Sequence, residues 1–228
     1  MKIRAIILSA LILCGISAVI MYSRAAQPQQ TSSVITQAIN DKNTPMVIKN
    51  LILKMKEQME VNDDQFPELI KEVENYTNSL ADSASVAVLH SMLAEMYQSY
   101  YQRNQWTINQ RTQLSGYIPE DIRVWTSNLF TNKIKEEIDL SLRPTALLQN
   151  TPVSKFKDIL EIGKDSQTLR PTLYEFLAFR ALDIQPTVQI YKDLIAFQNK
   201  EPNMKSVLLT ELDYLRFLYG DKRDKESF

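Results

Sequence analysis

Glycine, cysteine and histidine are scarce in this chain of 228 residues, which has four glycines, one cysteine and one histidine. Turns in β-sheet proteins use glycine wherever the backbone needs a positive φ, so its scarcity favours helices. The cysteine, Cys14, lies in an N-terminal apolar run, and the rest of the chain can form neither a disulfide nor a cysteine-based metal or redox site. That part must be held by its core alone, and about 200 residues are ample for one.

Residues 1–26 have the composition of a targeting segment. The positive charges of Lys2 and Arg4 precede the apolar run 5–22, and small residues around Ala25 suit cleavage after it. The sequence therefore predicts export, with contact to a membrane only through this segment.

Two other interpretations of the N-terminus stay open. An uncleaved anchor over 5–22 is slightly short of the roughly 20 residues that span a bilayer. A lipid attached to Cys14 would require processing before it, where the bulky Leu13 stands in place of the preferred small residue.

The chain beyond the targeting segment is mildly acidic. Residues 1–26 hold three basic side chains and no acids, so the remainder has 23 basic and 27 acidic side chains. Nucleic-acid binders show a basic stripe, and this balance does not suggest one. Short polar stretches at 27–33 and 220–228 are predicted as a linker and a tail around a helical domain over 34–219.

Prolines mark the predicted helix starts. Most of them stand just before an apolar-periodic run, where the missing N–H of proline costs nothing. Thr44-Pro45 and Thr151-Pro152 are predicted as N-cap pairs, the acids after Pro119 as a first turn, and Gly163 and Gly220 as left-handed residues after helix ends. Helices are predicted over residues 34–42, 45–60, 66–80, 83–104, 119–141, 155–162, 171–183, 187–199 and 203–219, with a short turn at 144–149.

The fold class that follows is all-α. No segment alternates with period two over enough residues to form a confident strand. The linkers are short, so neighbouring helices should pack antiparallel, as a bundle or a short α-solenoid after the export or anchor helix. The tetratricopeptide pattern is not met, and helix pairs recur at irregular spacing.

The only histidine, His90, lies in the stretch "HSMLAEMYQSYYQRNQW" over 90–106, which raises the question of an active site. The apolar side chains around it recur at three- and four-residue steps, which predicts one wide buried stripe. They are Val86, Leu89, Leu93, Met96, Tyr97, Tyr100 and Tyr101. His90 borders that stripe and is predicted to hydrogen-bond a neighbour at a helix–helix seam.

No catalytic, cofactor-binding or metal-ligating residue is predicted, and the chain is predicted not to be an enzyme. Glu95 lies five residues after His90, which turns the two side chains apart on a helix. Metal sites need several converging ligands, and the chain has neither a G-x-S-x-G stretch nor a glycine-rich phosphate loop. The paired acids Asp63-Asp64 and Glu136-Glu137 are predicted as solvated faces.

The last predicted helix is more apolar than one buried face requires. Its apolar residues are Val207, Leu208, Leu212, Leu215, Phe217 and Leu218. A helix of this kind should be covered on both sides, which predicts a missing partner surface in this chain or another.

Four stretches carry a family resemblance: "VLHSMLAEMYQSYYQRNQWTINQRT" (88–112), "PEDIRVWTSN" (119–128), "LRPTLYEFLAFRALD" (169–183) and "IYKDLIAFQNKEPNMKSVLLTELDYLRFLY" (190–219). In this order they resemble the N-terminal helical region of the large alpha-2-macroglobulin-like proteins of Bacteroidetes-type bacteria. The resemblance implies a helical lead-in to an exported protease trap of the periplasm or cell envelope. The trap's β-sandwich domains and its Cys-x-Glu-Gln thioester have no counterpart in this sequence.

Three hypotheses about function follow. The first is a non-catalytic helical domain of an exported alpha-2-macroglobulin-like protease-inhibitor system, contacting the remaining macroglobulin-like domains or proteases in cis or in trans. The second is a stand-alone envelope scaffold that binds protein partners. The third is an enzyme, which would need a catalytic base other than His90. The sequence gives no oligomeric state.

Overall fold

The computed structural model describes residues 35–39, 43–61, 65–112, 117–160, 166–200 and 203–220. The chain divides into two compact units, Met1–Asn43 and Thr44–Phe228. In the first, residues 35–39 are helical, inside the predicted helix 34–42. The predicted signal or anchor and the linker lie outside the described residues, as does the tail after Gly220. Across the described part of the chain, no helix combines the length and apolarity needed to cross a membrane.

The second unit is built from helices, which confirms the all-α prediction. Its elements are α3 (Thr44–Val61), α4 (Phe66–Ser79), α5 (Ser83–Arg103), α6 (Gln105–Ile108), the 3₁₀ turn η2 (Ile122–Val124), α7 (Ser127–Ser141), α8 (Thr145–Asn150), the 3₁₀ turn η3 (Val153–Phe156), α9 (Ser166–Leu169), α10 (Leu173–Ile184), α11 (Val188–Gln198) and α12 (Met204–Tyr219). The described residues contain no strand, and one isolated antiparallel bridge joins Pro152 to Thr172.

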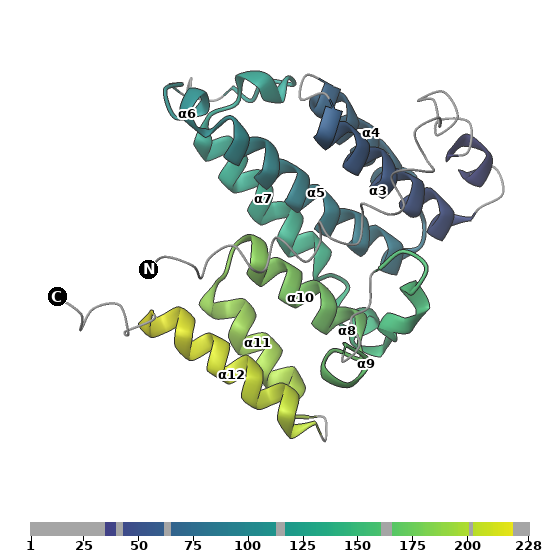
Figure 1. The fold of residues 1–228 in the computed structure, drawn as a ribbon, viewed down its shortest axis with the longest axis vertical. Coiled ribbons are helices and arrows are strands. Elements are labelled where there is room, and N and C mark those ends of the chain that lie inside the picture. The colour runs from purple at the N-terminus through teal and green to yellow at the C-terminus, as the bar shows by residue number, and fades with distance from the viewer. Residues whose placement is uncertain are drawn as a thin grey trace. The chain divides into compact units, whose positions relative to one another are not determined.

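Helix α5 is the centre of this unit and contacts α3, α4, α7 and α10 (Figure 1). The predicted stripe is largely buried, with Leu89, Leu93 and Tyr97 at most 1% exposed. The opposite side of α5 is also covered, because Ala84, Val88 and further small or apolar residues are buried there. A helix enclosed on all sides explains why small residues alternate with large ones along it.

An aromatic cluster fastens α7 to α5. The ring of Tyr97 stacks on Trp125 with centroids 5.7 Å apart, and Phe130 lies 5.3 Å from Trp125 and 5.7 Å from Tyr100. The Trp125 indole Nε1–H donates to the carbonyl of Pro119 at 2.7 Å. Rings in such offset and edge-on arrangements add to what area burial alone contributes.

Helices α10, α11 and α12 form a stack that leads away from α5. Helix α10 contacts α5 and α8, α11 contacts α10, and α12 contacts α11 (Figure 1). Helix α10 starts with a reciprocal capping box, in which Thr172 accepts from the Glu175 N–H and Glu175 accepts from the Thr172 N–H. The stack gives the molecule two kinds of surface, a groove beside α11 and the outer side of α12.

The predicted helix 119–141 begins eight residues late. Residues 117–126 form an irregular segment with the turn η2, and α7 starts at Ser127. The Asp121 side chain accepts from the Arg123 N–H at 2.9 Å, which closes a turn instead of a first helical turn. Trp125 stays extended because its indole reaches back to Pro119, and such tertiary contacts override local pattern.

The predicted helix 155–162 and the N-cap at Thr151 are also wrong. Residues 153–156 form the turn η3, and the preceding residues pair with the start of α10. The Val153 N–H donates to the Pro171 carbonyl at 2.9 Å, and the Leu173 N–H donates to the Thr151 carbonyl at 2.8 Å. Backbone pairing across this sequence distance leaves no signature in local periodicity.

The helix ends agree better with prediction. Helix α3 begins at Thr44, one residue before the start at Pro45 that its Thr-Pro pair predicts. Gly220 follows α12 with φ of 65°, which confirms the expected positive φ. Gly163 lies outside the described residues.

Candidate functional site

His90 lies at the seam between α5 and α7, as predicted. Its Nδ1 is 2.7 Å from Oε2 of Glu137, and Oε1 of the same carboxylate is 2.8 Å from Nζ of Lys133. The prediction of a solvated Glu136-Glu137 pair holds only for Glu136, because the Glu137 side chain is 2% exposed. Sequence reasoning missed this residue because helical acids are usually solvated.

His90, Glu137 and Lys133 form what we call the seam network, which stabilises the charged forms of Glu137 and Lys133. Burial favours the neutral form of Glu137, but the hydrogen bonds from His90 and Lys133 outweigh it and lower the pKa of the carboxyl. Burial works against the charged form of Lys133 as well, and its bonds to Glu137 and Glu136 raise its pKa. Both oxygens of Glu137 are therefore engaged by partners on α5 and α7, the arrangement of a structural bridge.

Helix α4 extends the same network. The Tyr97 hydroxyl donates to Oε1 of Glu74 at 2.7 Å, and Nζ of Lys133 lies 3.7 Å from that oxygen. Burial, followed by the charge of Glu74, raises the pKa of Tyr97 far above its ordinary value. The phenol remains a donor at any physiological pH, so it ties α4 to α5.

Glu95, the other acid near His90, faces a different helix. It forms an ion pair with Arg180 of α10, whose Nε also donates to Oγ of Ser91 at 3.0 Å. His90 and Glu95 thus join α5 to two different neighbours, as their five-residue spacing predicts. Among the residues that the structure describes, no group of three or more His, Cys, Asp or Glu side chains could hold a metal ion.

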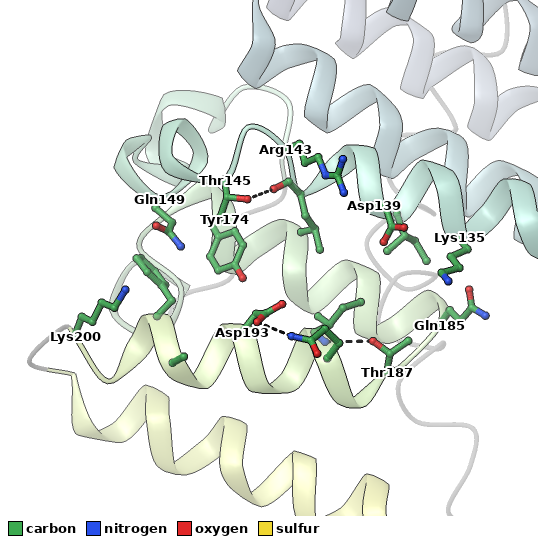
Figure 2. A pocket seen from close by; sticks show the side chains of 16 residues that line it. Lys135, Asp139, Arg143, Thr145, Gln149, Tyr174, Gln185, Thr187, Asp193 and Lys200 are labelled. Atoms are coloured by element: carbon green, nitrogen blue, oxygen red, sulfur yellow. Dashed lines mark hydrogen bonds between the residues drawn. The ribbon is translucent and has the colours of Figure 1, made fainter.

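A groove of about 770 Å³ lies between α7–α8 and α11, with α10 behind it (Figure 2). We call it the α7–α11 groove. Its lining is apolar at the base, from Ile138, Leu142, Tyr174, Ile190, Ala196 and Phe197. Its rim is polar and charged, from Lys135, Asp139, Arg143, Thr145, Gln149, Gln185, Thr187, Gln189, Asp193 and Lys200.

The rim of the groove carries both cationic and anionic side chains. Lys135, Arg143 and Lys200 face two carboxylates, and none of these cations forms an ion pair with another described residue. Asp193 accepts from Nε2 of Gln189 at 2.8 Å. Burial, followed by the charge of Asp193, raises the pKa of Tyr174 to about 12.

The second candidate surface is the outer side of α12, which we call the α12 outer stripe. Its members recur at steps of three and four residues and are Met204, Leu208, Leu212, Leu215 and Tyr219, between 44% and 69% exposed. The opposite side of α12 packs inward through Ser206, Val207 and Thr210. The surplus of apolar residues predicted for this helix lies mostly on its exposed surface, and within the described ranges only the side with Ser206, Val207 and Thr210 is buried, so the predicted partner surface stays a prediction.

Neither surface follows from a motif. The groove residues come from α7, α8, α10, α11 and the segments that join or follow them, and rows at four-residue steps, such as Lys135, Asp139 and Arg143, occur along its walls. A charged row at four-residue steps usually reads as a solvated face, so the groove was not anticipated.

Comparison of the chain with protein-family models, with curated proteins and with solved structures gives no match. Function must therefore be argued from the two surfaces and from the resemblance carried by residues 88–219.

Proposed function

We propose that this chain is a non-catalytic helical domain that binds other polypeptide through the α12 outer stripe. The observation that carries the proposal is the stripe itself, with five large side chains on one face of a 16-residue helix. Scattered apolar side chains on a surface are ordinary, but a contiguous apolar face marks an interaction site.

The stack of α10, α11 and α12 supports a further helix as the partner of the stripe. Each of these helices packs against the one before it, so a further amphipathic helix laid on α12 would continue the same arrangement. Lys205 and Arg216 lie along one edge of the stripe and Glu211 along the other. A partner helix with an acidic edge and a basic edge would match them.

The resemblance supports an exported alpha-2-macroglobulin-like protein as the source of that helix. The domain would then act as a structural and interaction module of a protease-inhibitor system in the bacterial periplasm or cell envelope. The partner would be the remaining macroglobulin-like domains or a protease, in cis or in trans. The alternative is a stand-alone envelope scaffold, which the same stripe would serve through a different protein.

The size of the native polypeptide separates these proposals. An antibody against residues 44–220 would be used on fractionated envelope from the source organism. We expect a band several times larger than the 26.3 kDa of this sequence. A band near 26.3 kDa would contradict the macroglobulin-like assignment and favour the scaffold.

The contact itself is tested by a photocrosslinking residue placed at Leu212 in the native polypeptide. The matched control is the same residue at Leu53 of α3, which is 52% exposed against 44% for Leu212. We expect crosslinks from position 212 to map to an amphipathic helix, and position 53 to give none. Equal crosslinking from both positions would refute a docking role for the stripe.

A further inference from the structure

We propose that the α7–α11 groove binds an extended polypeptide segment of about four residues, apolar in its middle and acidic at the end that meets Lys200. This goes beyond the proposed function, because the groove and the α12 outer stripe are separate surfaces. Tyr191 of α11 packs toward α12, with its ring 5.2 Å from that of Tyr214, whereas Ile190 and Asp193 face the groove.

The dimensions suit a short extended segment. The volume of about 770 Å³ falls within the roughly 300–1,000 Å³ of ordinary ligand clefts. The wall runs from Lys135 on α7 to Arg143, two residues past the end of α7 at Ser141. At the helical rise of 1.5 Å per residue this separation is on the order of 12 Å. An extended chain advances about 3.3–3.6 Å per residue, so about four residues span this wall.

The hydroxyl of Tyr174 lies in the groove and bonds to no other described residue. Tyr174 is 4% exposed, its ring packs edge-on against Phe197 at 5.2 Å, and its hydroxyl points into the groove (Figure 2). That hydroxyl forms no hydrogen bond with any other residue that the structure describes. Because its pKa is raised to about 12, the phenol keeps its proton and can donate to a peptide carbonyl.

Amide side chains stand along the rim where a peptide main chain would pass. Gln149 and Gln185 lie toward opposite ends of the groove, and neither side chain bonds to another described residue (Figure 2). A carboxamide offers both donors and an acceptor, as a peptide unit does. An extended segment has unpaired N–H and C=O groups, so these amides can satisfy them at both ends.

The charged side chains on the rim of the groove favour one class of ligand over others. Lys200 lies with Gln149 at one end of the groove, away from Asp139, and Asp193 lies between the two ends (Figure 2). A single acidic side chain is therefore favoured at the Lys200 end. A phosphate-rich ligand would meet the carboxylates of Asp139 and Asp193, and a lipid chain would meet a polar rim.

The test uses two fluorescein-labelled tetrapeptides blocked at both termini, with the full chain in detergent and fluorescence anisotropy as the readout. One has aspartate at both ends around leucine and phenylalanine, and the other has lysine at both ends. We expect the aspartate peptide to bind roughly tenfold tighter, which corresponds to about one charge-assisted contact. Equal affinities for the two peptides, or binding of neither, would overturn the proposal.

Two groove variants and one control variant test where the peptides bind. Lys200→Glu should reverse the preference between the two peptides, while the matched control Lys49→Glu, at an exposed position of α3 that does not line the groove, should leave it unchanged. Tyr174→Phe should weaken both peptides about tenfold without loss of helicity, because the hydroxyl bonds to no other residue that the structure describes. Unchanged affinity in both Lys200→Glu and Tyr174→Phe would place the binding elsewhere and refute the groove.

Discussion

Helices α5 and α12 have similar apolar compositions and opposite surroundings. Both carry large apolar residues on more than one side, but α5 is enclosed by four neighbouring helices and α12 contacts α11 along one side. Leu93 of α5 is 1% exposed and Leu212 of α12 is 44% exposed. The same residue type at the same helical spacing therefore stabilises the fold in one place and lies exposed, on the surface that we propose for docking, in the other.

The buried faces of α5 and the exposed stripe of α12 also differ in the size of their side chains. Small residues such as Ala84 and Ala87 let α5 fit between its neighbours, whereas the α12 outer stripe contains only large side chains. Large side chains projecting from one helix face are the knobs that a further helix would accept.

The largest loss of stability is expected from a substitution in α5, the central helix. Leu93→Ala removes a fully buried side chain and should lower the free energy of unfolding by about 2–5 kcal/mol, through lost transfer energy and a residual cavity. Urea unfolding followed by circular dichroism measures the change. Wild-type-like unfolding would mean that α5 is not the core helix.

A smaller loss of stability is expected from a substitution in the seam network. Lys133→Met leaves the buried Glu137 and its neighbour Glu74 without their shared cation, which should cost about 1–3 kcal/mol. Lys135→Met is the control, because Lys135 forms no ion pair with another described residue. Equal losses in the two variants would contradict a structural role for the bridge.

The same carboxylate makes stability depend on pH. The folded state lowers the pKa of Glu137 from its ordinary 4.5, so its contribution is complete above 4.5 and is lost as the pH falls through the lowered value. Glu137→Gln should therefore lose less stability than the wild type between neutral pH and pH below 4.5. Parallel acid titrations of the two proteins would contradict the ionised bridge.

His90→Ala should have a modest effect, about 0.5–1.5 kcal/mol, because Lys133 still engages the carboxylate of Glu137. Helicity should be unchanged in circular dichroism. A loss as large as that of Leu93→Ala would show that the seam depends on the imidazole more than its single contact implies.

The smallest effect is expected on the outer side of α12. Leu212→Ala should change the unfolding free energy of the isolated domain by no more than about 0.5 kcal/mol, since the side chain is largely in water. Leu212→Glu should in addition abolish contact with the partner helix. A core-like loss from Leu212→Ala in the isolated domain would remove the contrast with α5.

Periodicity predicted the helices that bury a continuous stripe. The α5 stripe and its histidine lie where three- and four-residue steps place them, and α10, α11 and α12 occur within a few residues of prediction. The helix predictions were wrong at 119–126 and 151–156, where tertiary contacts determine the backbone conformation. There the backbone is set by partners distant in sequence or by an indole that folds back, and no local pattern records them.

The candidate surfaces were predictable to different extents. The α12 outer stripe is visible in sequence as surplus apolar residues, because one helix face needs only some of them. The groove depends on how five segments come together, and its central hydroxyl, Tyr174, has the sequence signature of a core aromatic residue. Burial of a ring does not reveal where its polar end points.

The backbone conformation of Gly220 sets the direction in which the chain leaves α12. Its φ of 65° with ψ of 173° is a conformation open essentially to glycine, yet a Cβ built there meets nothing within 4 Å. The obstacle to a side chain at this position is therefore chirality and not space. A D-alanine would keep the direction in which the backbone leaves the apolar helix, whereas an L-alanine of identical volume would turn it.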